Sequence, residues 1–101
     1  ARNDVLTIIP GPLDDERLRA QIAASDAVAI IKLGRHFARI RALIADLGLT
    51  DSAVYVERVS LENQKLMPLA DAAGEAPYFS MILIYKGAED WVTSLAPGGK
   101  E

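Results

Sequence analysis

The chain has 101 residues, of which 50% are hydrophobic and 25% are charged, and its formal net charge at pH 7 is -3. This length and composition are those of one soluble globular domain with a single core. The negative charge argues against a general nucleic-acid binder, and no apolar run approaches the roughly 20 residues that cross a bilayer. The chain has no cysteine, which excludes disulfides and thiolate metal sites. Since no signal peptide is visible, we expect a cytoplasmic protein.

The N-terminal part of the chain predicts a strand followed by a helix. Residues 5–9 form a short β-branched run, which a Pro-Gly-Pro turn at residues 10–12 closes. Asp14 is expected to be the helix N-cap, and the acidic residues after it suit the positive end of the helix dipole. Leu13 and Leu18 stand at the two positions of a hydrophobic staple. We therefore interpret the acidic start as structural and not as a metal site.

A second strand and a second helix follow. Residues 27–33 are apolar at nearly every position, as is typical of a strand that helices cover on both faces. Over residues 37–47 the apolar residues recur with helical spacing on one face, and Arg39, Arg41 and Asp46 are expected to face outward. Gly48 is expected to end this helix in the left-handed conformation.

The junction between this strand and this helix carries three basic residues, Lys32, Arg35 and His36. A helix N-terminus carries positive partial charge, so basic residues there oppose the dipole and call for solvent or an anionic ligand. The junction also follows the carboxyl end of a strand, where open α/β sheets hold ligands. The chain has no cysteine and a single histidine, His36, so its own residues cannot form a Cys/His catalytic pair or a His-rich metal site. By itself, His36 reads as an ordinary residue at a helix start.

The remaining sequence predicts three more strands and then a tail. Residues 53–59 are the third strand, and residues 64–67 are a short edge strand. Residues 68–73 are expected to form one or two helical turns. Residues 78–85 are the last strand, whose unbroken apolar run predicts a central place in the sheet. Residues 87–101 are expected to be a flexible tail.

The order of elements, β-α-β-α-β-β-β, predicts an α/β fold with a mixed sheet flanked by helices. Right-handed crossovers join the parallel strands, and the last two of the roughly five strands are expected to run antiparallel to the others. Residues 1–86 would form this domain.

This topology brings three separate segments to one edge of the sheet. If the second and third strands are parallel, residues 31–33 and 58–60 end at the same edge, and an antiparallel last strand begins there at residues 78–80. The segments contribute basic side chains, among them Lys32 and Arg58, and an aromatic pair. They predict a ligand crevice. The alternative is that the cations are solvated strand ends and the aromatic pair belongs to the core.

The same segments resemble the C-terminal domain of the tetrapyrrole methylase family, whose members methylate precorrin macrocycles with S-adenosylmethionine. The resemblance spans residues 5–86 and rests on residues 6–10 (LTIIP), 30–35 (IIKLGR), 43–48, 56–58 (VER) with Gln64, and 76–80 (APYFS). It implies two α/β domains with the cofactor folded in the cleft between them. The N-terminal catalytic domain of that fold has no counterpart in this sequence.

The resemblance also implies the site residues. Family members contact the cofactor at positions that correspond to Lys32, Val59 and Phe79, although many relatives carry methionine where this chain has Lys32. A precorrin bears many carboxylates, so Arg35, His36 and Arg58 are expected to bind the substrate. None of the chain's own residues is expected to be catalytic, and no metal is expected.

The resemblance further implies a homodimer that binds neither nucleic acid nor membrane, and a chain that is inactive without its partner domain. Within the family, the sequence does not separate a methylase of metal-free precorrins from one of the cobalt-factor type. From a different class, a non-catalytic ligand-binding or dimerisation module with a similar sheet is the alternative.

Overall fold

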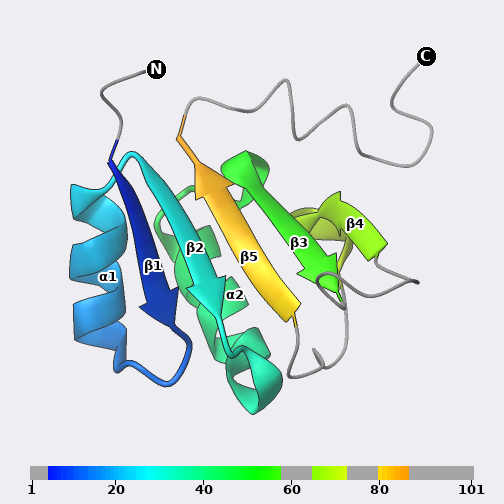
Figure 1. Ribbon diagram of the computed structural model, residues 1–101, viewed down its shortest axis with the longest axis horizontal. Helices are drawn as coiled ribbons and strands as arrows, with labels where there is room; N and C mark the ends of the chain where they lie inside the picture. Colours follow the sequence, from blue (N-terminus) through cyan, green and yellow to red (C-terminus); the bar gives the residue numbers. More distant parts are fainter. Residues whose placement is uncertain (1–4, 58–64, 73–79, 87–101) are drawn as a thin grey trace.

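Five strands form one mixed sheet in the order β1-β2-β5-β3-β4 in the computed structural model, which describes residues 5–57, 65–72 and 80–86 (Figure 1). The strands are β1 (Leu6–Pro10), β2 (Ala27–Ile31), β3 (Ala53–Glu57), β4 (Lys65–Pro68) and β5 (Ser80–Tyr85). The sheet confirms the predicted α/β class, including the short edge strand β4 and the central position of the last strand. The predicted tail, residues 87–101, lies outside the described residues.

Strand directions follow the prediction. β1 and β2 are parallel, and β5 lies between β2 and β3 and runs antiparallel to both. β4 pairs antiparallel with β3 at the edge of the sheet. The first three strands therefore run in one direction and the last two in the other.

In the described ranges, two α-helices and three 3-10 turns connect the strands. The helices are α1 (Asp15–Ala24) and α2 (Phe37–Asp46), and the turns are η1 (Gly34–His36), η2 (Thr50–Ser52) and η3 (Leu69–Asp71). Asp14 caps α1 as predicted, because its carboxylate accepts a hydrogen bond of 2.9 Å from the backbone N–H of Arg17. Gly48 ends α2 with a φ of 74°, the predicted left-handed conformation.

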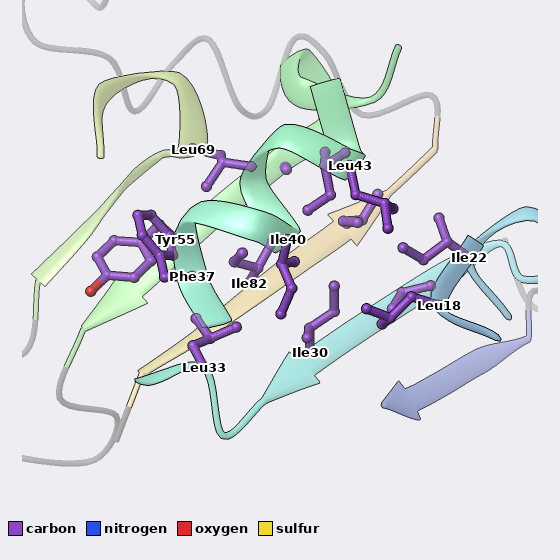
Figure 2. Packing of buried hydrophobic residues seen from close by; sticks show 14 of the residues in the cluster. Leu18, Ile22, Ile30, Leu33, Phe37, Ile40, Leu43, Tyr55, Leu69 and Ile82 are labelled. Carbon is purple, nitrogen blue, oxygen red and sulfur yellow. The ribbon is translucent and has the colours of Figure 1, made fainter. Parts of the chain in front are cut away.

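The core lies between the sheet and the two helices (Figure 2). Leu18 and Ile22 of α1 and Ile40 of α2 are fully buried, and they share one cluster with Ile30 of β2 and Ile82 of β5. A buried leucine or isoleucine side chain contributes about 1.5–3 kcal/mol relative to an exposed one. This shared cluster therefore holds both helices on the sheet.

Both helices pack on the same face of the sheet, so the prediction that helices cover β2 on both faces is wrong for the described part of the chain. The reason lies in the strand order. The crossovers from β1 to β2 and from β2 to β3 advance in the same direction along the sheet, and two right-handed crossovers of that kind place their helices on one side. On the other face, Val54 and Val56 pack with Met81 and Leu83 in a smaller cluster.

No helix in the described ranges is long and apolar enough to span a membrane. Those ranges also hold no group of three or more histidine, cysteine, aspartate or glutamate residues arranged to bind a metal ion.

Candidate ligand-binding site

The carboxyl ends of β1, β2 and β3 meet the beginnings of β4 and β5 at one edge of the sheet. The strand pairing places Ile31 beside both Pro10 and Met81, and Glu57 beside Ser80. Within the described residues, strand ends far apart in the sequence therefore lie at a common edge, as the predicted topology required.

A pocket of about 250 Å³ opens beside the end of β2. It is lined by Pro12, Lys32, Leu33, Gly34, Arg35 and His36. The pocket thus brings together three of the six predicted site residues. The other three, Arg58, Val59 and Phe79, lie outside the described residues.

The chain bends sharply where β2 ends. Lys32 has a φ of 57° and is the one non-glycine residue with a positive φ among the residues the structure describes. This left-handed conformation costs a residue with a side chain about 1–2 kcal/mol. It ends the strand at Ile31, two positions before the predicted end at residue 33. Leu33 is fully buried and anchors the bend in the core. Strained backbone held by its surroundings is common at ligand sites.

Arg35 and His36 precede α2 and do not form its first turn. They lie in the 3-10 turn η1, which begins at Gly34 with a φ of 43°. The backbone N–H of His36 donates to the carbonyl of Leu33 at 2.8 Å, which closes the turn. The basic residues therefore stand at the rim of the pocket, immediately before the helix.

Two of these cations have no ionic partner in the described part of the chain. The side chains of Lys32 and Arg35 are exposed, and neither forms a hydrogen bond or ion pair with a described residue. The nearby Arg39, by contrast, is paired with Asp15. The pocket rim therefore carries two positive charges that an anionic ligand would balance.

Arg39 is a residue of this site that the sequence interpretation placed on the outer, solvated face of the helix. Its Nη2 donates to the carbonyl of Gly11 at 2.9 Å and lies 3.2 Å from Nδ1 of His36. Its Nη1 donates to the carboxylate of Asp15. Two features of the sequence could have indicated these contacts: the spacing of three residues between His36 and Arg39, and the acidic start of the preceding helix.

Tyr55 connects the end of β3 to the start of α2. Its ring packs against Phe37 with 5.3 Å between centroids, and its hydroxyl donates to a carboxylate oxygen of Glu57 at 3.3 Å. Burial, and then the charge of Glu57, raise the pKa of Tyr55 above its ordinary value. Tyr55 therefore stays a neutral hydrogen-bond donor at this edge of the sheet.

A larger hollow, of about 540 Å³, lies against α2, η2 and η3, but its walls are less suited to a charged ligand. It is lined by Phe37, Ala38, Arg41, Ala42, Ala45, Thr50 and Ala70. The guanidinium of Arg41 already donates to the carbonyl of Ala70 at 3.0 Å. This hollow contains none of the predicted site residues, so the smaller pocket is the better candidate.

Comparison with known proteins gives related sequences. A precorrin-2 C(20)-methyltransferase from Sinorhizobium sp. is 41% identical over 83 residues, which are 81% of this chain and 34% of that protein. The cobalamin biosynthesis protein CobIJ of Mycobacterium bovis is 36% identical over 88 residues, which are 86% of this chain and 17% of that protein. CobIJ of Mycobacterium tuberculosis gives the same values. No family model matches the chain.

These relatives and the fold agree with the resemblance drawn from the sequence. The chain spans about a third of the length of the Sinorhizobium protein and about a sixth of the CobIJ proteins. The matched stretch includes most of the described sheet and helices, since it covers more than four fifths of the chain. The chain is homologous to a precorrin-2 C(20)-methyltransferase and to cobalamin biosynthesis proteins, which confirms its resemblance to the tetrapyrrole methylase family.

Proposed function

We propose that this chain is part of an S-adenosylmethionine-dependent precorrin-2 C20-methyltransferase of cobalamin biosynthesis and supplies one wall of its ligand cleft. The observation that carries the proposal is the 41% identity with the Sinorhizobium precorrin-2 C(20)-methyltransferase. The pocket supports it as well, because Lys32 and Arg35 have no ionic partner among the described residues and a precorrin is a polycarboxylate.

The size of the pocket supports the idea of a shared cleft. Small-molecule sites generally have about 300–1,000 Å³, whereas this pocket has about 250 Å³. Its residues fit one portion of the cofactor or one acidic substituent of the macrocycle. The remainder of the cleft would come from the domain that the family fold adds, and Val59 and Phe79 are the proposed cofactor contacts beside Lys32.

When bound, S-adenosylmethionine supplies a methyl group from its sulfonium sulfur to a nucleophilic carbon of the macrocycle. The residues of this chain bind and orient. Lys32 offers an aliphatic stem beside the cofactor and an ammonium group toward the substrate. Arg35, His36 and Arg58 hold carboxylates, which fixes the macrocycle relative to the methyl donor.

The substrate role is tested by charge reversal in a protein of the relatives' full length that carries this chain. Arg35→Glu should raise the KM for precorrin-2 at least about tenfold at low salt, because it replaces attraction by repulsion at the rim. Arg17→Glu is the matched control, since it changes the net charge equally on the exposed surface of α1. An unchanged substrate affinity in Arg35→Glu at low salt would remove this residue from the site.

The shared cleft is tested with the 101-residue chain alone. We expect weak or undetectable binding of S-adenosylhomocysteine in isothermal titration, and no methyl transfer, because one wall of the cleft is absent. Micromolar binding by this chain would contradict the proposal. A cytoplasmic homodimer is part of the same proposal, and sedimentation of the full-length protein tests its oligomeric state.

Two alternatives are separated by further measurements. A corrin-ring methylase of the cobalt-factor type would methylate a cobalt-containing macrocycle in preference to precorrin-2 when both are offered. A non-catalytic ligand-binding or dimerisation module would lack an upstream coding region with a glycine-rich loop. Of these two alternatives, the CobIJ relatives favour the corrin-ring methylase over the non-catalytic module, since their name places them in cobalamin biosynthesis.

A further inference from the structure

One guanidinium group ties together the segments that surround the pocket. The guanidinium of Arg39 forms hydrogen bonds with Gly11 in the turn after β1, with Asp15 at the start of α1, and with His36 in η1. The turn is itself fixed to β2, because the N–H of Gly11 donates to the carbonyl of Ile31 at 2.7 Å. Two of these partners hold the guanidinium independently of the histidine.

The contact with His36 fixes which ring nitrogen carries the proton. A guanidinium has five N–H donors and no acceptor. At 3.2 Å from Arg39 Nη2, the Nδ1 of His36 must therefore accept the hydrogen bond. A hydrogen bond in this direction places the ring proton on Nε2. Within the described residues, no group bonds to that Nε2–H.

We propose that Arg39 is a positioning residue that sets the ring orientation and tautomer of His36, so that His36 presents its Nε2–H as a hydrogen-bond donor to a ligand in the pocket. The ligand atom that fits is an oxygen acceptor, such as a carboxylate oxygen. Lys32 and Arg35 then attract the ligand by their positive charge, and His36 orients it by a directional hydrogen bond. The role of His36 in binding a ligand rests on the proposed function, whereas the assignment of its tautomer does not.

The test uses the fact that the chain has one histidine, so its ring signals need no assignment. Long-range ¹H–¹⁵N correlation spectra of the ¹⁵N-labelled chain are recorded about two pH units above the reference histidine pKa of ~6.5. For the wild type we expect two widely separated ring ¹⁵N shifts, with the proton on Nε2. In Arg39→Met the separation should narrow, because the freed ring exchanges between both tautomers.

Arg19→Met is the matched control. Arg19 also joins the two helices, through an ion pair of 2.7 Å with Asp46, but it does not contact the histidine. This variant should keep the wide wild-type separation, which separates a loss of interhelix pairing from a loss of the His36 contact. A spectrum of Arg39→Met equal to that of the wild type would overturn the proposal.

The wild-type spectrum tests the proposed role of Arg39 by itself, even if Arg39→Met does not fold. Averaged ring shifts, or a proton on Nδ1, would contradict the proposed arrangement directly. Because no ligand is present, either result leaves the methyltransferase proposal unaffected. Conversely, a normal substrate affinity in Arg35→Glu would count against that proposal and not against the role of Arg39.

Discussion

Gly11 packs directly against the backbone at the end of β2. A Cβ atom at this position would lie 2.6 Å from the carbonyl oxygen of Lys32 and 3.3 Å from that of Ile31. Backbone atoms cannot rotate away as a flexible side chain does. The turn after β1 therefore reaches the strained bend at Lys32 only with glycine at this position, and this contact holds the two walls of the pocket together.

We expect Gly11→Ala to lower the free energy of unfolding by about 2–3 kcal/mol, as overpacking against fixed atoms does. Gly34→Ala is the control: its φ of 43° adds strain, but a Cβ there meets nothing within 4 Å, so a loss of about 1 kcal/mol is expected. Urea denaturation of both variants measures the difference. An equal or larger loss in Gly34→Ala would show that the close approach at Gly11 is unimportant.

The second prediction at the residue scale concerns Tyr55 and alkaline pH. Burial and the Glu57 carboxylate raise the pKa of this phenol above its ordinary value of 10.0. The folded state then holds the proton more tightly than the unfolded state. This stabilisation is present below pH 10 and is lost as the pH rises through the raised pKa.

The free energy of unfolding should therefore fall more steeply above about pH 10 in the wild type than in Tyr55→Phe, which lacks the titrating group. Denaturant titrations at several alkaline pH values measure this slope. Parallel pH profiles for the two proteins would mean that Tyr55 ionises as easily in the folded state as in the unfolded chain.

At the scale of an element, the start of α1 depends on its capping residue. Asp14→Ala should cost about 1 kcal/mol, because it removes the acceptor for one of the unpaired N–H groups of the first turn. Asp14→Asn retains an acceptor oxygen and should cost much less. Thermal unfolding compares the two. Equal losses would assign the effect to the negative charge and not to the hydrogen bond with the Arg17 backbone.

Element positions could be predicted where the signal was local. The Asp14 cap and the Gly48 terminator were correct because each depends on neighbouring residues in the chain. The end of β2 was placed too late, because Lys32 adopts a left-handed conformation that its residue type does not favour. That conformation is imposed by the buried Leu33 and the close Gly11, and neither contact is visible in the sequence.

The same distinction applies to the candidate site. Lys32, Arg35 and His36 were identified by charge and by their place after a strand, and they line one pocket. Arg39 was missed, because its helical position predicted a solvated side chain. Its partners come from a turn and a helix more than 20 residues away in the sequence, at Gly11 and Asp15.

For the whole molecule, the two faces of the sheet differ. The helices cover one face, while Leu6 and Ile8 of β1 and Leu66 of β4 lie on the other with exposures of 63%, 64% and 49%. Leu66 lies on the opposite edge strand of the sheet from β1, so Leu6 and Ile8 are the exposed apolar pair of the β1 edge. Apolar side chains exposed on an edge strand favour association. We expect the 101-residue chain to self-associate as its concentration rises, through contacts that include β1.

The double variant Leu6→Thr/Ile8→Thr should remain more monomeric in sedimentation velocity, since threonine has the β-branched shape favoured in strands and exposes less apolar surface than leucine or isoleucine. Gln21→Thr, at an exposed position on α1, is the control and should associate like the wild type. If the double variant associates as strongly as the wild type, the exposed residues of β1 take no part in the contact.

The sequence by itself determined the α/β class, the directions of the strands and the basic residues at the end of β2. These follow from hydrophobic period, turn residues and the handedness of crossovers, all of which act over short distances along the chain. Only the tertiary structure decided that both helices share one face, that Lys32 is left-handed and that Arg39 holds His36. Those features depend on strand order and on contacts between distant segments, which no local pattern encodes.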